Sequence, residues 1–192
     1  MSLRRTGKDW QLLFRYNARE SPIQPRSAFY IPERKMRQRQ NWHRLPMVGV
    51  SIKAIEEYLS WLQKRSALIQ PRLCSEFEWE RAARGADARE YPHGYTVSPS
   101  DANFFDTYGR NPATVGPDET GAFPSSRSPF EVDDMCGNAA EFTRSSLEDG
   151  KHILRGGNYA GTSNDIRSNN RQPVDDKYRA VTTGFRLCAD FE

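Results

Sequence analysis

Three short polar blocks in the C-terminal half constrain this 192-residue chain more than any other feature. The first block, residues 134–142, places two carboxylates, a glycine and an amide within nine residues, and loop-like sequence flanks it. The second reads Arg-Gly-Gly-Asn-Tyr at residues 155–159, and the third reads Gly-Phe-Arg-Leu at residues 184–187. Turn-forming residues also interrupt residues 95–130 every few positions. The pattern predicts a loop-rich domain that aromatic side chains anchor.

The first predicted helix covers residues 51–64. Ser51 is a suitable N-cap, and no proline or glycine interrupts the sequence that follows it. Ile55, Leu59 and Leu62 recur at helical spacing, so we expect a helix that packs on the core.

The second predicted helix covers residues 72–85. Ser75 and Glu78 have the spacing of a capping box, in which each side chain accepts a hydrogen bond from a free backbone N–H. Gly85 stands where a helix end favours a left-handed residue. The residues expected to face the core are Phe77, Ala82 and Ala83.

Other segments give weaker signals. Residues 152–160 and 183–189 are predicted to be short strands that pair near the end of the chain. Residues 10–16 fit a strand or a short helix, and residues 34–42 are polar enough for a surface loop. Arg155 and Arg186 are expected to brace the loop-rich core through backbone carbonyls.

The blocks resemble the formylglycine-generating enzyme family, also called the sulfatase-modifying-factor family. Residues 72–80, Arg-Leu-Cys-Ser-Glu-Phe-Glu-Trp-Glu, are similar to the family signature Arg-Leu-Pro-Thr-Glu-x-Glu-Trp-Glu, with Cys74 in place of proline. Tyr-Pro-His-Gly at residues 91–94 resembles the family's Tyr-Pro-Trp-Gly. The resemblance implies an α+β, C-type-lectin-like fold over residues 45–192, loop-rich, with two helices and short antiparallel strands. Residues 1–44 are interpreted as a basic segment, the remnant of a longer protein.

Three stretches look like modules at the C-termini of bacterial serine/threonine protein kinases. They are Arg-Leu-Cys-Ser-Glu at residues 72–76, Arg-Gly-Ala-Asp-Ala-Arg-Glu-Tyr-Pro at residues 84–92, and Ser-Pro-Phe-Glu-Val-Asp-Asp-Met at residues 128–135. The chain itself has neither the glycine-rich loop nor the His-Arg-Asp segment of a kinase. An upstream kinase domain in a longer chain is therefore the expected partner.

The net charge of +3 hides an asymmetry, because residues 1–40 carry +7 and the remainder carries −4. A basic arm can mark nucleic-acid binding, but no helix-turn-helix, finger or RNA-binding motif accompanies this one. We therefore expect no nucleic-acid partner. No apolar run approaches the length of a membrane span, so no membrane association is expected either.

The three cysteines, Cys74, Cys136 and Cys188, are widely spaced and form neither a CxxC nor a zinc pattern. A reduced cytoplasmic setting is the simplest interpretation, with at most one disulfide.

The resemblance implies a calcium site made by the side chain of Asp134, the carbonyls of Gly137 and Ala139, and the carboxylate of Glu141. Calcium takes six to eight oxygen ligands, and each of these positions offers one. In the alternative interpretation, the carboxylates are only solvated or cap a helix.

The resemblance also locates the cysteine pair with which the family enzyme binds copper(I) and oxidises a substrate cysteine. Counting back from Arg171, the two positions fall on Ser163 and Ser168. A serine hydroxyl does not replace the soft thiolate that copper(I) prefers, so we expect neither copper nor formylglycine-generating activity.

A polar, turn-rich stretch between two strand-like blocks is the predicted ligand surface, because amides adapt their hydrogen bonds to a ligand. In the alternative interpretation, the same residues are present only because turns favour them. The predicted ligand-binding residues are Asn158, Tyr159, Asn164, Asp165, Asn169, Asn170 and Arg171.

The sequence thus predicts a non-catalytic ligand-binding or sensor module of a larger bacterial signalling protein, with an unknown ligand or protein partner. The alternatives are a diverged family oxidase with unidentified catalytic residues, and a structural or oligomerisation domain.

Overall fold

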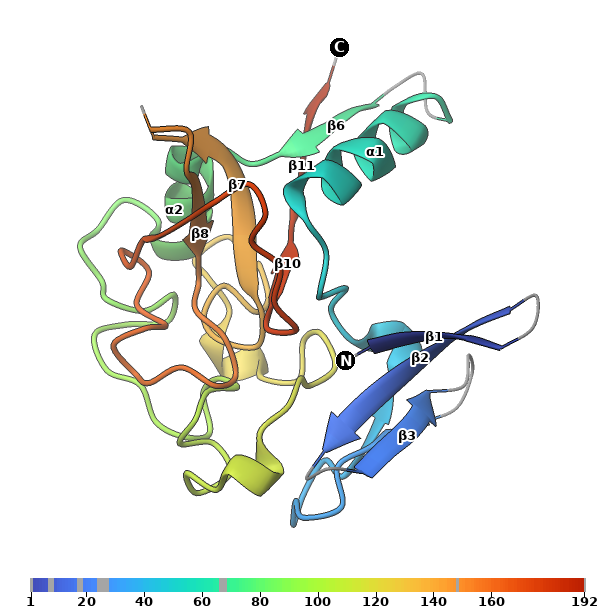
Figure 1. Cartoon of the computed structure of the whole chain (residues 1–192). Helices are drawn as coiled ribbons and strands as arrows, with labels where there is room; N and C mark the ends of the chain where they lie inside the picture. Colours follow the sequence, from blue (N-terminus) through green and yellow to red (C-terminus); the bar gives the residue numbers. More distant parts are fainter. Residues whose placement is uncertain are drawn as a thin grey trace.

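The computed structural model describes residues 2–6, 9–16, 19–23, 28–65, 69–147 and 149–191 (Figure 1). The chain begins with a three-stranded antiparallel sheet of β1 (Ser2–Thr6), β2 (Asp9–Tyr16) and β3 (Arg19–Ile23), in that order. Residues 10–16 therefore form a strand, which was one of the two structures predicted for them.

A small hairpin of β4 (Ala28–Tyr30) and β5 (Arg39–Asn41) follows, and a single 3₁₀ turn at Trp42–Arg44 ends it. The prediction that residues 34–42 form a surface loop was wrong for two side chains. Arg34 and Gln40 are buried, because both reach the carboxylate of Asp118 in the distant loop region. A charge can be buried where an opposite charge and several acceptors surround it.

The first helix, α1 (Ile52–Gln63), confirms its prediction within one residue at each end. Ser51 caps it by accepting a hydrogen bond from the backbone N–H of Ala54 at 3.3 Å. Its buried residues, Ile52 and Ile55, join a core cluster with the central sheet, where Phe142 and Leu154 meet them.

The second helix, α2 (Glu76–Arg84), has the predicted capping box between Ser75 and Glu78, and Gly85 ends it at φ 69°. It begins later than predicted, because residues 72 and 73 belong to a strand and the capping box sets the helix start. Trp79 and Ala83 face the core. Phe77 was predicted to do the same and does not, since its side chain is 86% exposed. At about 100° per residue, a side chain two positions before Trp79 points to the opposite side of the helix.

The central sheet has the order β10-β7-β8-β9, formed by β7 (Ala140–Ser146), β8 (His152–Arg155), β9 (Gln172–Val174) and β10 (Thr183–Phe185). β10 runs parallel to β7, and the other neighbours are antiparallel. The two strands predicted near the end of the chain exist, but they do not pair with each other, because both lie beside β7. α2 lies against β7 and β8 (Figure 1).

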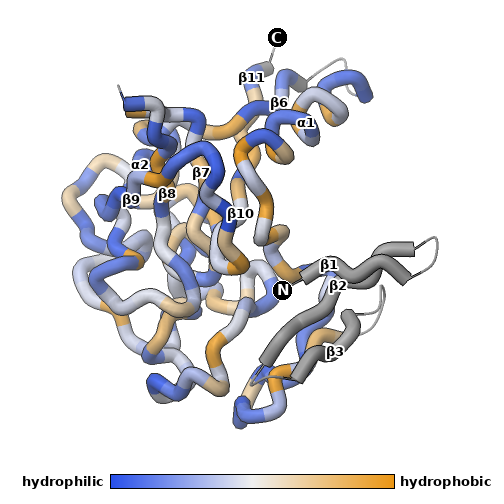
Figure 2. Tube along the Cα trace, in the orientation of Figure 1, coloured by the Kyte–Doolittle hydropathy of each residue, from blue (hydrophilic) through white to orange (hydrophobic). Residues whose placement is uncertain are grey.

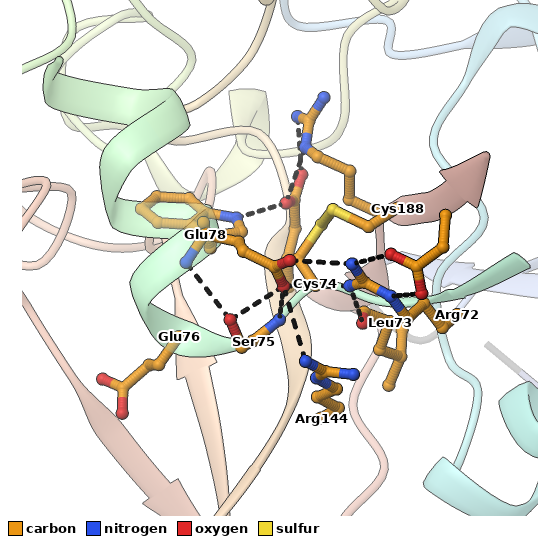
Figure 3. Close-up of a disulfide and its surroundings, with 12 residues drawn as sticks. Arg72, Leu73, Cys74, Ser75, Glu76, Glu78, Arg144 and Cys188 are labelled. Carbon is orange, nitrogen blue, oxygen red and sulfur yellow. Dashed lines mark hydrogen bonds and ion pairs between the residues drawn. A yellow bond between two sulfur atoms is a disulfide. The ribbon is translucent and has the colours of Figure 1, made fainter. Parts of the chain in front are cut away.

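The last strand, β11 (Leu187–Phe191), pairs with β6 (Ile69–Leu73) in a separate two-stranded ladder. A disulfide joins Cys74 to Cys188 beside this ladder (Figure 3). Arg72 adds an ion pair to Asp190 at 2.6 Å and one to Glu78 at 2.7 Å. The C-terminal strand is thus held to the start of α2 by a covalent bond and by charge.

The long segment between α2 and β7 contains only two single 3₁₀ turns, Pro112–Thr114 and Pro124–Ser126. Hydrophobic stretches of the chain are short and interrupted by hydrophilic ones (Figure 2). The fold is α+β and loop-rich with two helices, as predicted. Neither helix in the described part of the chain has the length and apolar character needed to cross a membrane.

Candidate functional site

The block at residues 134–142 forms a backbone turn that leads into β7, and its residues 135–142 are buried. Asp134, Gly137 and Asn138 all have positive φ, at 58°, 75° and 62°. A Cβ atom on Gly137 would lie 2.3 Å from the carbonyl oxygen of Asn103, so only glycine fits there. The backbone N–H of Asn138 donates to the same oxygen at 2.7 Å. The block therefore serves first to join two loops.

Glu141, a predicted calcium ligand, is already surrounded by donors. Its carboxylate accepts one hydrogen bond from the indole Nε1 of Trp79 at 2.6 Å. The guanidinium of Arg186 donates to both carboxylate oxygens, at 2.9 and 2.8 Å. A second Arg186 N–H reaches the carbonyl of Asp133 at 3.0 Å, which confirms the predicted bracing role of this arginine.

Asp134, the other predicted carboxylate ligand, accepts a hydrogen bond from the backbone N–H of Gly121 at 2.8 Å. Burial raises its pKa from 3.8 to about 6, because the charged form loses its hydration. The described residues contain no cluster of three or more His, Cys, Asp or Glu side chains that could hold a metal ion.

Both carboxylates of the predicted calcium site therefore already have partners within the domain. A calcium ion at Glu141 would have to share the carboxylate with Arg186 or displace it, and two adjacent cations repel each other. Calcium binding at Asp134, Gly137, Ala139 and Glu141 stays a prediction. It requires that Glu141 share its carboxylate with Arg186 or release it.

The polar stretch borders a cleft of about 330 Å³ between the central sheet and the loop after β8. Three of the predicted ligand-binding residues, Asn158, Asp165 and Asn170, come together on its wall. The other lining residues are Ala140, Leu154, Gly157, Ala160, Gly161, Gln172 and Thr182. The lining residues thus carry one carboxylate, three side-chain amides and one hydroxyl.

The loop holds this shape through its own hydrogen bonds. Asp165 accepts from the backbone N–H and from the hydroxyl of Thr162, both at 2.7 Å. Asn170 donates from its side chain to the carbonyl of Asp165 at 2.7 Å, and the side chain of Asn158 caps the N–H of Ala160 at 2.9 Å. The turn-forming role proposed as the alternative is therefore present alongside the cleft.

The remaining predicted ligand residues lie elsewhere. Tyr159 is not on the surface: its side chain is 6% exposed and its hydroxyl donates to the carbonyl of Val181 at 3.2 Å. Its ring therefore belongs to the packed interior and is not part of the cleft lining. Arg171 is exposed and pairs with Glu76, and Asn164 and Asn169 are exposed outside the cleft lining.

Arg155 supports the loop from beneath. Its guanidinium donates to the carbonyls of Ser168, Asn169 and Asn170 at 2.8, 3.3 and 3.0 Å, as the sequence predicted. It also pairs with Glu80 of α2 at 2.5 Å. One buried cation therefore fixes the cleft wall relative to the second helix.

Ser163 and Ser168 occupy the positions assigned to the cysteine pair. They contact the neighbouring residues Tyr91 and Glu90, respectively. The carbonyl of Ser163 accepts from the hydroxyl of Tyr91 at 3.1 Å, and the N–H of Ser168 donates to the carbonyl of Glu90 at 2.7 Å. The hydroxyl of Ser168 is buried and has no hydrogen-bond partner within the described chain.

The cysteines offer no accessible thiol. Cys74 and Cys188 are joined to each other. Cys136 is buried, and the loss of hydration raises its pKa to about 12, so its thiol stays protonated at neutral pH.

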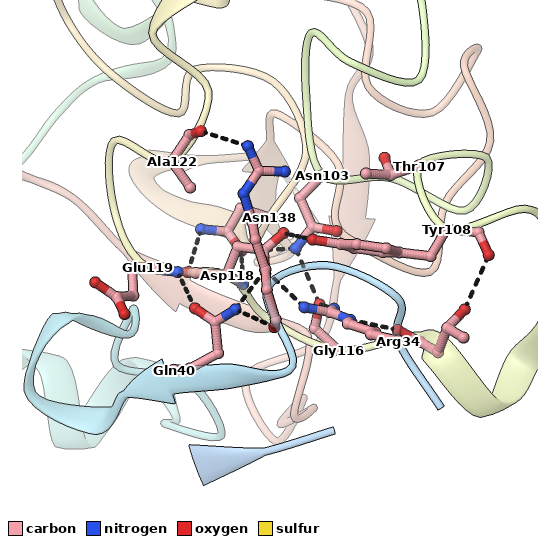
Figure 4. Close-up of polar contacts among 12 residues, drawn as sticks. Arg34, Gln40, Asn103, Thr107, Tyr108, Gly116, Asp118, Glu119, Ala122 and Asn138 are labelled. Atoms are coloured by element: carbon pink, nitrogen blue, oxygen red, sulfur yellow. Dashed lines mark hydrogen bonds and ion pairs between the residues drawn. The ribbon is translucent and has the colours of Figure 1, made fainter. Parts of the chain in front are cut away.

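A buried polar network around Asp118 was not predicted from the sequence (Figure 4). Arg34 donates to Asp118 at 2.6 Å, and Tyr108 and Gln40 donate to the same carboxylate at 2.7 and 2.9 Å. Asn138 joins through its side-chain oxygen, which accepts from the N–H of Asp118 at 2.9 Å. These residues are scattered over about 100 positions, so no local pattern marks them.

Comparison with curated proteins finds serine/threonine-protein kinase Pkn1 of Chlamydia trachomatis serovar L2, which is 29% identical over 192 residues. The match covers 90% of this chain and 28% of that protein. The Chlamydia pneumoniae kinase pkn1 is also 29% identical, over 89% of this chain and 27% of its own. The chain thus spans little more than a quarter of the length of these relatives.

Two solved structures share the fold. The structure of PvdO from Pseudomonas aeruginosa has a TM-score of 0.68 at 24% identity, over 79% of this chain and 64% of that one. Treponema denticola variable protein 1 has a TM-score of 0.68 at 14% identity, over 100% and 99%. The model of the sulfatase-modifying factor enzyme 1-like domain, also called FGE-sulfatase, matches residues 6–191. This chain therefore belongs to the sulfatase-modifying factor enzyme 1-like domain family.

Proposed function

We propose that this chain is a non-catalytic ligand-binding or sensor domain of a larger bacterial signalling protein, associated with a kinase. The Chlamydia relatives support the association, because they are named as serine/threonine-protein kinases and are more than three times as long as the matching segment.

The observation that carries the proposal is the chemistry of the cleft. Its lining has amides, a hydroxyl and one carboxylate, and it has no cysteine, histidine, lysine or arginine. Such a surface donates and accepts hydrogen bonds, and it contains none of the cysteine, histidine or lysine side chains that often act as nucleophile or base in covalent catalysis. We infer a small, polar, uncharged or cationic ligand, held by Asn158, Asn170 and Gln172 and oriented by Asp165.

The state of the cysteines supports a role without thiol chemistry. Two of the three are joined to each other, and the third is buried and protonated. The serines at positions 163 and 168 would leave the copper chemistry of the family enzyme without its ligands. Calcium at residues 134–141 and a cytoplasmic location remain further parts of this proposal. The Cys74–Cys188 disulfide counts against that location, because a reducing cytoplasm would keep both side chains as thiols.

Binding is tested by recording side-chain amide signals in ¹⁵N NMR spectra while free amino acids, dipeptides and monosaccharides are added one at a time. We expect a compound that shifts the amide signals of Asn170 and Gln172. Gln172→Ala changes a residue of the cleft wall and should lower the affinity for that compound by about tenfold, because a polar contact to the ligand is lost. Lys177→Ala, an exposed change outside the lining, should bind like the wild type.

Catalysis is tested separately. The protein is incubated with copper(I), O₂ and a Cys-x-Pro-x-Arg peptide, and the peptide is examined for aldehyde by mass spectrometry. No aldehyde is expected. Sustained turnover would overturn the non-catalytic proposal whatever the cleft binds.

A further inference from the structure

The outward side of α2 exposes aromatic and cationic side chains together. Phe77, Arg81 and Arg84 follow at i, i+4 and i+7, so they share one side of the helix. Phe77 is 86% exposed, and Phe130, which is 53% exposed, lies with its ring 5.6 Å from the guanidinium carbon of Arg81. We call these four residues the α2 outer face. Two exposed phenyl rings close to an exposed cation are the kind of surface that often marks an interaction site.

A groove of about 300 Å³ runs along this face. Its lining residues are Phe77, Glu80, Arg81, Arg84, Gly85 and Asp87. The segment that carries Phe130 is fixed at the end of the helix, because a Cβ atom on Gly85 would lie only 3.2 Å from the ring of Pro129. The groove is therefore framed by a helix on one side and by a closely packed loop at its end.

The charges in the groove are not balanced. Glu80 is paired with Arg84 at 2.9 Å and with Arg155 at 2.5 Å, and Asp87 is paired with Arg89 at 2.6 Å. Arg81 is exposed and makes no ion pair with any described residue. Both acids of the groove are thus neutralised within the domain, and the unmatched charge is positive.

We propose that the α2 outer face docks a short acidic segment of a partner protein. In the complex, a carboxylate of that segment meets Arg81, and a bulky apolar side chain packs against Phe77 and Phe130. Arginine and aromatic residues are the types that carry most binding energy at interfaces. A basic segment is disfavoured, because it would bring a second positive charge to Arg81 without a free carboxylate to receive it. This surface is separate from the cleft beside β8, so the proposal does not depend on the cleft ligand.

The whole chain is titrated into a fluorescently labelled ten-residue peptide of alternating glutamate and leucine, and anisotropy reports binding. Phe77→Ser and Arg81→Glu should each weaken binding by at least about tenfold. A peptide with serine in place of leucine should also bind more weakly. The charge-reversed peptide of lysine and leucine should bind Arg81→Glu better than the wild type. Both changes are on exposed positions, so the melting temperature verifies that the fold is intact.

Tyr30→Ser is the matched control, because it removes an exposed aromatic ring on β4, outside the α2 outer face. It should bind the acidic peptide like the wild type. Equal affinity of the wild type for the acidic and the basic peptide would overturn the proposal, as would unchanged affinity in Phe77→Ser and Arg81→Glu. Sedimentation that shows a dimer dissociated by Phe77→Ser would assign this face to a second copy instead. Binding to anionic lipid vesicles without binding to the acidic peptide would assign it to a membrane surface.

Discussion

Arg34 and Asp118, 84 positions apart in the chain, form an ion pair at 2.6 Å in which both side chains are completely buried. Two other N–H groups of the guanidinium donate to the carbonyls of Thr114 and Gly116, at 2.7 and 2.6 Å. The pair ties the segment around the β4–β5 hairpin to the loop region that ends at the 134–142 block. Residues 28–41 are therefore an integral part of the packed domain.

Removing the cation should be costly. Arg34→Met leaves the carboxylate of Asp118 buried without its counter-charge, and breaking such a pair costs about 3–5 kcal/mol. Arg44→Met is the matched control, because its ion pair with Glu119 is exposed and should contribute less than about 1 kcal/mol. Urea unfolding measures both free energies. Equal losses in the two variants would contradict a stabilising role for the buried pair.

Glu141 should matter for stability even without calcium. Glu141→Gln removes the charge that Arg186 faces and one of its acceptors, which costs about 2 kcal/mol in a buried setting. We therefore expect a lower melting temperature in excess chelator. A calcium ion that binds this carboxylate would add a further difference between the wild type and the variant when calcium is present. A defect seen only in calcium would show that the ion, and not Arg186, is the partner that counts.

Asp134 predicts a pH dependence. Its pKa is about 6 in the folded protein and near 3.8 when unfolded, because burial penalises the charged form. The contribution of Asp134 to the free energy of unfolding is therefore complete below about pH 4, and it is lost as the pH rises through 6. The difference corresponds to about 3 kcal/mol.

Asp134→Asn should therefore stabilise the protein at pH 7–8 in the absence of calcium, with no gain at pH 4. Asparagine tolerates the positive φ of 58° and can keep the hydrogen bond from Gly121. Asp133→Asn, at a partly exposed neighbour paired with Arg127, should not show this gain. A constant difference between Asp134→Asn and wild type from pH 4 to 8 would exclude Asp134 as the titrating group.

Substitutions in the polar loop after β8 should have large effects on stability at its buried residues and small effects at its exposed ones. Tyr159→Ala removes a buried ring and should cost about 3–5 kcal/mol. Tyr159→Phe removes only the hydroxyl that bonds to Val181 and should cost about 1 kcal/mol. Asn169→Ala, on the exposed outer side, should stay within about 0.5 kcal/mol. A near-zero cost for Tyr159→Ala would restore the interpretation of this tyrosine as a surface residue.

The disulfide should be the strongest single constraint on the unfolded chain. Cys74 and Cys188 are 114 positions apart, and closing a loop of that length stabilises by about 4–5 kcal/mol in the chain-entropy model. We expect dithiothreitol to lower the urea midpoint of the wild type and to leave Cys74→Ala/Cys188→Ala unchanged. Equal sensitivity of the two proteins would show that the bond does not form in solution. A reducing cytoplasm would keep the two thiols apart, so the redox state of the native protein also tests its location.

Sequence alone determined the elements whose causes lie within a few residues. Ser51 and the Ser75–Glu78 pair satisfy backbone N–H groups one turn away, so the N-cap of α1 and the capping box of α2 could both be predicted. The spacing of the three polar blocks was sufficient to identify the family, because these residues build local turns that few other side chains can replace. Part of the cleft was also predictable, since Asn158, Asp165 and Asn170 form their turns within the same loop.

Only the tertiary structure decided which polar residues are buried and which apolar ones are not. The local sequence predicts a surface arginine at Arg34, but the side chain is buried where it pairs with Asp118. The local sequence predicts a ligand-binding aromatic at Tyr159, but its hydroxyl bonds to the carbonyl of Val181 inside the domain. Phe77 was predicted to lie in the core, but α2 places Trp79 there and leaves Phe77 exposed. In each case the free energy depends on a partner far away in the sequence. Burial of a charge or a ring is favourable only where the fold supplies that partner, and a local pattern carries no information about it.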